Sequence, residues 1–316
     1  MRPVAYPPVN PVTAMAVEAK RDKETSRKRQ QYAAVNRIAL TCDHPQKLVH
    51  GRSGNSGNAL GIERMREIDD RNASGANMIV DLNGAWARLW ESQPVDLVSG
   101  QWTILLVLVL GLVLPRPVWR ITGMYSTLVH ELGHVISALF TGRFVTGLRL
   151  GWDHSGEVVS RGRGKVSIII SGIFGYPAPL LVSAALLWAT AAGYAGRALG
   201  IYALFFVLAL VFVRNWPAFV VCSASALVAL GVVFFAPSSA YIYLALLLGG
   251  FLLCSGIRDY LKVLAVHTWR RRDIEQSDAY LIARATGTFA TLWLLVIMAL
   301  GGAGIFLGVQ SLLRLF

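Results

Sequence analysis

The stretch Ile121–Phe140, with the sequence ITGMYSTLVHELGHVISALF, decides the fold of this chain. It has the apolar character and length of a membrane-spanning helix, which needs about 20 such residues. Its centre nevertheless holds the polar run His130-Glu131-Leu132-Gly133-His134. Ionisable side chains are costly inside a bilayer, so this run marks a functional site unless it only joins helices through hydrogen bonds.

The composition of the whole chain agrees with a membrane protein. Of the 316 residues, 54% are hydrophobic and 15% are charged, whereas a soluble domain carries about 25% charged residues. The net charge of +12 comes mainly from Arg, and basic residues in the loops of a membrane protein report its orientation, so no nucleic-acid partner is expected. Cys42, Cys222 and Cys254 have no paired spacing and predict neither a disulfide framework nor a cysteine-rich zinc site.

Apolar runs dominate from Leu97 onward and predict an all-α polytopic membrane protein, because backbone groups in lipid must be satisfied within each helix. About six to seven transmembrane helices are expected. The predicted spans are Leu97–Leu114, Ile121–Phe140, Val166–Ala192, Ala198–Val213, Ala218–Phe235, Ser239–Gly256 and Thr286–Val309. A short amphipathic helix within Asp81–Asp96, carrying Trp86 and Trp90, is expected at the water–lipid interface.

Residues 1–80 are predicted to form a disordered, basic N-terminal extension. They contain a proline-rich start, a charged run from Lys20 to Arg29 and a Gly/Ser/Asn tract over Gly51–Gly57. Such a composition cannot bury enough apolar surface to fold. No secretory signal peptide is expected, and Met78 is an alternative start. Residues 81–316 are predicted to form one membrane-embedded domain.

Two polar loops separate the predicted spans. Thr141–Lys165 is rich in Gly, and its parts Val145–Leu150 and Glu157–Ser160 are expected to pair as a short β-hairpin after the HExxH helix. Arg258–Arg284 is strongly basic, and the positive-inside rule places it in the cytoplasm. Counting back through the spans places the hairpin loop and the N-terminus there as well. We therefore expect a multi-pass protein of the cell membrane, whose oligomeric state the sequence does not assign.

The spacing of the two motif histidines predicts a metal site. His130 and His134 lie one helical turn apart on the same face, so one nitrogen of each ring can bind a shared Zn²⁺ at about 2.0–2.1 Å. Glu131 follows His130 directly and is predicted to act as the general base on a water molecule. Such a run is rare by chance in a chain with only 6 His residues.

A catalytic zinc site uses three protein ligands and leaves one position open. Two carboxylates near the late spans are candidates for the third ligand. Asp278 follows Ser277, a possible helix cap, whereas Asp259 has Arg258 beside it and is also suited to an interfacial ion pair. His154 and Glu157 in the hairpin loop are further candidates, with no helical position to fix them.

The HELGH run within a spanning segment resembles the site-2 protease family of intramembrane zinc metalloproteases, in its bacterial, site-2-protease-like branch. Further stretches that resemble this branch are LPRPVWR (114–120), TGR (141–143), SGEVVSRG (155–162), GYPAP (175–179), Arg214-Asn215 and Ser277-Asp278-Ala279. The resemblance extends from Leu97 to the C-terminus and leaves the N-terminal extension outside.

The resemblance implies zinc-dependent hydrolysis of peptide bonds within or near the transmembrane segments of other proteins. It makes His130 and His134 zinc ligands, Glu131 the base, and an Asp of a later span the third ligand. The Leu-Asp-Gly run of better-known members is missing here. Ser277-Asp278-Ala279 resembles the branch's own version, which favours Asp278 over Asp259.

Other functions stay open at this point. Asn215 is a candidate for holding the substrate backbone, or it serves as an interfacial anchor. A catalytically silent membrane scaffold would keep the helix packing without a productive metal. A small transporter would use the buried histidines as a proton relay, although the chain has no internal repeat of the kind many transporters show. One Zn²⁺ per chain is the predicted cofactor, and membrane-protein substrates and the lipid bilayer are the predicted partners.

Overall fold

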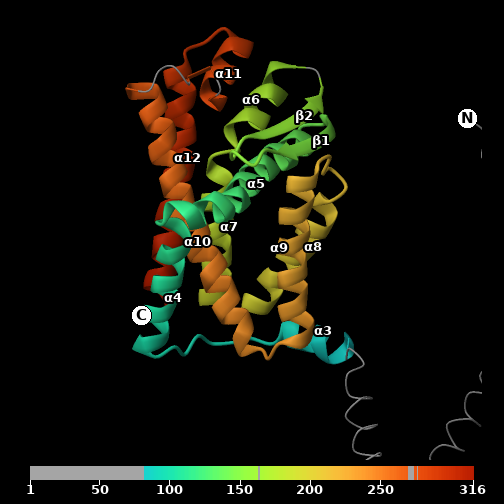
Figure 1. Cartoon of the computed structure of the whole chain (residues 1–316), viewed down its shortest axis with the longest axis vertical. Helices are drawn as coiled ribbons and strands as arrows, with labels where there is room; N and C mark the ends of the chain where they lie inside the picture. The colour runs from blue at the N-terminus through green and yellow to red at the C-terminus, as the bar shows by residue number, and fades with distance from the viewer. Residues whose placement is uncertain (1–81, 163, 270–273, 276) are drawn as a thin grey trace, which may run out of the picture. The chain divides into compact units, whose positions relative to one another are not determined.

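The computed structural model describes residues 82–162, 164–269, 274–275 and 277–316, so the predicted N-terminal extension lies outside the described residues. The elements in chain order are α3 (Leu82–Trp90), α4 (Ser99–Val113), α5 (Arg116–Phe140), β1 (Phe144–Leu150), β2 (Gly156–Arg161), α6 (Lys165–Ile173), α7 (Pro177–Ala191), α8 (Ala195–Ala209), α9 (Trp216–Phe235), α10 (Ser239–Thr268), α11 (Asp278–Thr286) and α12 (Ala290–Leu313). Figure 1 shows a helical protein with one small sheet, which confirms the predicted fold class.

Three helices, α9, α10 and α12, are long and apolar enough to cross a membrane. In the most apolar stretch of α10, 56% of the residues are buried inside the protein, against 28% in α9 and in α12. Helix α10 is therefore central, while α9 and α12 turn most of their apolar side chains outward. Exposed apolar surface of this extent is covered by lipid in a membrane protein. The protein is membrane-embedded.

Three predicted spans correspond to two bent helix pairs: Leu97–Leu114 and Ile121–Phe140 to the pair α4–α5, and Val166–Ala192 to the pair α6–α7. Helices α4 and α5 meet at 92°, and α6 and α7 meet at 58°. A proline stands in the first turn of the second helix of each pair, Pro117 in α5 and Pro177 in α7, where its missing N–H cannot continue the preceding helix. If each pair crosses once, the described residues hold five candidate spans and the shorter apolar helix α8. The predicted count of six to seven is thus not confirmed.

The loop after α5 forms the predicted β-hairpin. Strands β1 and β2 pair antiparallel from Phe144 with Arg161 to Leu150 with Gly156. The opposite edge of β1 binds the connection between α8 and α9. The Leu148 N–H donates to the Phe212 carbonyl at 2.8 Å, and the Arg214 N–H donates to the Leu148 carbonyl at 2.9 Å. The hairpin is therefore fixed to the helical bundle at this edge.

The C-terminal part differs from the single span predicted over Thr286–Val309. The short helix α11 precedes α12, and Gly287, with a φ of 76°, ends α11 in the left-handed conformation that favours glycine. Ser277 caps the start of α11 by accepting a hydrogen bond from the Tyr280 N–H at 3.3 Å. A Cβ atom on Gly172 would lie 2.5 Å from Ile282, so the missing side chain lets α6 approach α11 closely. Asp278 is thereby brought to the α5–α6 side of the bundle.

Candidate metal centre

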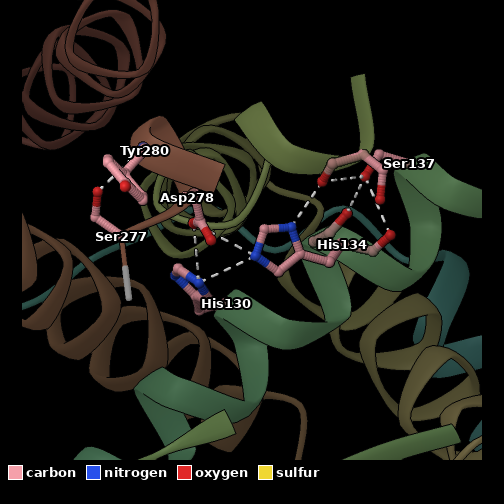
Figure 2. A network of polar contacts seen from close by, with 8 residues as sticks. His130, His134, Ser137, Ser277, Asp278 and Tyr280 are labelled. Carbon is pink, nitrogen blue, oxygen red and sulfur yellow. Dashed lines mark hydrogen bonds and ion pairs between the residues drawn. The ribbon is translucent and has the colours of Figure 1, made fainter. Parts of the chain in front are cut away.

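Three side chains from two distant parts of the sequence meet at one point, as Figure 2 shows. The Nε2 atoms of His130 and His134 lie 3.2 Å apart. The Oδ2 atom of Asp278 lies 3.4 Å from each of them. Ligand atoms at about 2.0–2.1 Å from one tetrahedral zinc stand about 3.3 Å apart. The three atoms therefore have the spacing of one face of a tetrahedral zinc site.

The surroundings of these atoms fit a metal ion. Asp278 Oδ2 is buried and has no hydrogen-bond partner among the described residues. Burial alone would raise the pKa of the Asp278 carboxyl, but the interactions with the His134 and His130 rings outweigh it, and the pKa lies below its usual value. The group is thus an ionised carboxylate, the form that binds metal.

Gly175 leaves open space beside the two histidine nitrogens. A Cβ atom at this residue would lie 2.4 Å from His134 Nε2 and 2.7 Å from His130 Nε2. Any other residue type would place a side chain where a shared metal ion has to sit. The glycine between α6 and α7 therefore shapes the centre.

The orientation of the His134 ring is fixed from α6. Its Nδ1 atom lies 2.6 Å from the Ser171 carbonyl, which can only accept, so Nδ1 carries the proton and Nε2 is free to bind a metal. Ser171 lies in the last turn of α6, whose carbonyls have no partner within the helix. The break between α6 and α7 thus supplies the acceptor. Gly133 lets the motif helix pack closely against this break, because a Cβ on Gly133 would lie only 2.4 Å from the Phe174 carbonyl oxygen.

Glu131, the predicted base, is buried, with 6% of its surface exposed. Its carboxylate lies against the first residue of β2, because a Cβ on Gly156 would stand 2.1 Å from Glu131 Oε1. The three predicted ligand side chains are between 13% and 16% exposed. The centre is therefore largely shielded from bulk water without being sealed.

The other candidates for the third ligand lie outside this cluster. Asp259 Oδ2 accepts a hydrogen bond from the Ser126 hydroxyl at 2.9 Å. His154 has a φ of 67° and donates from Nε2 to the Arg120 carbonyl at 3.0 Å, which ties the hairpin turn to α5. Glu157 stands opposite Arg149 in the hairpin and is exposed. The geometry favours Asp278 among the four.

Asn215 uses its side chain within the protein. Its Nδ2 donates to the Leu150 carbonyl at 2.7 Å, and its Oδ1 accepts from the Leu150 N–H at 3.2 Å. The same oxygen caps α9 by accepting from the Ala218 N–H at 3.4 Å. The amide therefore extends the edge of β1 as a neighbouring strand would. The predicted contact with substrate stays a prediction, and these bonds do not favour it.

Three residues of the centre carried no predicted role: Ser171, Gly156 and Gly175. Gly156 and Gly175 lie in stretches that carry the family resemblance, which was the available signal. Ser171 acts through its backbone carbonyl, a group that every residue has, and nothing in the sequence distinguishes it.

Comparison with known proteins gives one match. The sequence profile described as Peptidase M50B-like matches residues 103–308, a region that includes the whole motif helix and Asp278. No curated protein matches the chain significantly, and neither does any solved structure. The match covers more than half of the chain, and the chain belongs to the Peptidase M50B-like family.

Proposed function

We propose that this protein is a zinc-dependent intramembrane protease that cleaves transmembrane segments of other membrane proteins, as in regulated intramembrane proteolysis. The observation that carries the proposal is the triangle of His130 Nε2, His134 Nε2 and Asp278 Oδ2 within a membrane-embedded peptidase fold. A silent scaffold has no need for a buried carboxylate oxygen that stands 3.4 Å from two histidine nitrogens and has no other hydrogen-bond partner among the described residues, so this oxygen favours the enzyme.

The three residues would hold one zinc ion and leave its fourth position open for water or substrate. When bound, zinc would polarise the scissile carbonyl and make a water molecule more acidic. Glu131 follows a ligand directly in sequence and has a buried carboxylate, which suits it to accept the proton of the attacking water. Glu131 would then deliver this proton to the leaving amide nitrogen.

Shielding of the centre has a chemical consequence. Charged groups interact more strongly where bulk water is excluded. The electrostatic interactions of Glu131 and the three ligands with a bound zinc ion and the substrate would therefore be stronger than on the protein surface. The bond to the Ser171 carbonyl keeps the His134 ring in the tautomer that the centre needs.

The test compares Glu131→Gln with His134→Ala in the purified, reconstituted full chain. Loss of the base is expected to lower cleavage of a transmembrane substrate by about 10²–10⁴-fold while zinc is retained. Loss of a ligand is expected to remove both zinc and cleavage. Unchanged cleavage by a folded Glu131→Gln protein would sink the proposal and leave the scaffold hypothesis in its place.

A further inference from the structure

A cavity of about 510 Å³ lies between α5, α7 and α8. Its wall is formed by aliphatic and aromatic side chains, among them Val129 and Ile136 of α5, Leu186 of α7 and Phe206 of α8. Neither the predicted ligands nor Glu131 line it. Val129 and Ile136 flank the HELGH run, so the cavity lies behind the metal-binding helix and is separate from the centre itself.

The cavity wall contains one charged side chain, Arg197 in the first turn of α8. Its guanidinium lies 4.3 Å from the ring centre of Tyr194 and 5.2 Å from that of Trp90. Nη2 donates to the Trp90 carbonyl at 2.6 Å. Nε is buried without a hydrogen-bond partner, and no carboxylate forms an ion pair with this guanidinium among the residues that the structure describes. Within the described part of the chain Arg197 therefore has no anionic partner, although two aromatic rings and one carbonyl contact it at one end of an apolar cavity.

The surroundings of Arg197 are those of a membrane interface. Helix α3 packs against the N-terminal end of α8 and the C-terminal end of α9, which lie side by side (Figure 1). Trp86 and Trp90 of α3 are 63% and 54% exposed, as expected of aromatic side chains at the level of lipid headgroups. Arg88 of α3 donates to the Phe234 carbonyl at 3.5 Å, and its Nε also has no partner in the described part of the chain. A second cation thus lies at the same end.

We propose that this cavity binds one anionic phospholipid, with its phosphate at Arg197 and an acyl chain between α5, α7 and α8. Arginine binds phosphate through paired N–H donors, which would use the guanidinium that the protein leaves unpaired. The wall from Arg197 to Phe206 follows α8 for nine residues, about 14 Å, and offers an acyl chain apolar contact along this length. An apolar helix in the same place would leave the guanidinium of Arg197 without an anionic partner.

The experiment measures lipid that stays with the protein. The full chain is reconstituted in phosphatidylcholine with and without phosphatidylglycerol, extracted in mild detergent, and analysed by native mass spectrometry. Wild type is expected to retain one phosphatidylglycerol. Arg197→Gln is expected to retain about fivefold less, the effect of one interfacial cation. Arg197→Lys, which keeps the charge, is expected to fall between them.

Two further variants separate the contribution of the lipid headgroup to binding from that of the acyl chain. Ala185→Phe places a ring in the cavity from an exposed wall residue and leaves Arg197 in place, and it is expected to displace the lipid. Arg314→Gln removes an exposed arginine that does not line the cavity, at the end of α12, and is expected to retain lipid as wild type does. Thermal unfolding in the same detergent checks that each variant is folded.

Three results would overturn the proposal. Folded Arg197→Gln or Ala185→Phe protein with wild-type lipid retention would do so. Displacement of the lipid by inorganic phosphate would reduce the site to a simple anion site, and displacement by an apolar helical peptide would assign the cavity to a protein segment. Because bound lipid is the readout, the outcome is independent of whether Glu131 and zinc act as proposed.

Discussion

At the residue scale, Asp278 and Asp259 provide a matched pair of carboxylates for testing the third ligand. Asp278 Oδ2 lies 3.4 Å from both histidine nitrogens, whereas Asp259 Oδ2 is bonded to Ser126. We expect Asp278→Asn to lower zinc content from about one ion per chain to a small fraction, because two ligands hold zinc far less tightly than three. Asp259→Asn is expected to retain zinc. Metal analysis of both purified variants checks this, and the reverse result would exchange the roles of the two residues.

Gly175 allows a second test at this scale, which fills the space beside the two histidine nitrogens instead of removing a ligand. Gly175→Ala adds only a methyl group, but that atom would stand 2.4 Å from His134 Nε2. Zinc affinity is expected to fall by about tenfold or more, at least as much as when a group that orients a metal ligand is lost. Competition with a chelator measures the change. Gly302→Ala in α12, where a Cβ would have no atom within 4 Å, is the control and should bind zinc normally.

At the element scale, the HELGH run and the hairpin were predictable from sequence, because each depends on neighbouring residues. The spacing of His130 and His134 fixes one helix face, and the Gly-rich loop between two β-prone stretches fixes the turn. The bends were harder to predict. Pro117 and Pro177 were visible, but whether a proline ends a span or bends it within the membrane depends on the helices packed around it.

The meeting of Asp278 with the histidines could not be derived from local pattern. It depends on the close approach of α6 to α11 at Gly172 and on the bend that leaves the Ser171 carbonyl free. Both are tertiary features. Among the four candidates, only the resemblance of Ser277-Asp278-Ala279 to the family branch favoured Asp278, the one that the structure brings to the two histidines.

Asn215 allows a test at the element scale, because its side chain joins β1 to the start of α9. Asn215→Ala removes two hydrogen bonds to Leu150 and the cap on Ala218, which we expect to cost about 1–3 kcal/mol of unfolding free energy. Hydrogen exchange at the Leu150 amide should rise. Asn215→Ser should restore the cap at α9 while leaving Leu150 exchange as high as in Asn215→Ala. Weakened substrate binding without faster exchange at Leu150 would instead support the predicted substrate contact.

At the scale of the whole molecule, the bent pair α4–α5 changes the expected sidedness. The sequence-based expectation places the hairpin and the N-terminus together in the cytoplasm by counting Leu97–Leu114 and Ile121–Phe140 as two crossings. If the bent pair crosses only once, α3 and the hairpin lie on opposite sides of the membrane. Figure 1 shows α3 and the C-terminus at one end of the described bundle and the hairpin with α11 at the other. In that case the hairpin and the N-terminus cannot both lie in the cytoplasm, as the sequence-based expectation had placed them.

Cysteine labelling decides between these topologies. Trp152 in the hairpin turn is 64% exposed and Trp86 in α3 is 63% exposed, so each can be replaced by a single Cys in a chain whose native cysteines are Ser. If α4 and α5 cross the membrane once, we expect a membrane-impermeant maleimide, applied to intact cells, to label Trp86→Cys and not Trp152→Cys, because the positive-inside rule keeps the basic loop and the hairpin beside it in the cytoplasm. Membranes opened with mild detergent control for reactivity and should label both. Equal labelling of the two sites in intact cells would place them on one side and require α4 and α5 to cross the bilayer separately.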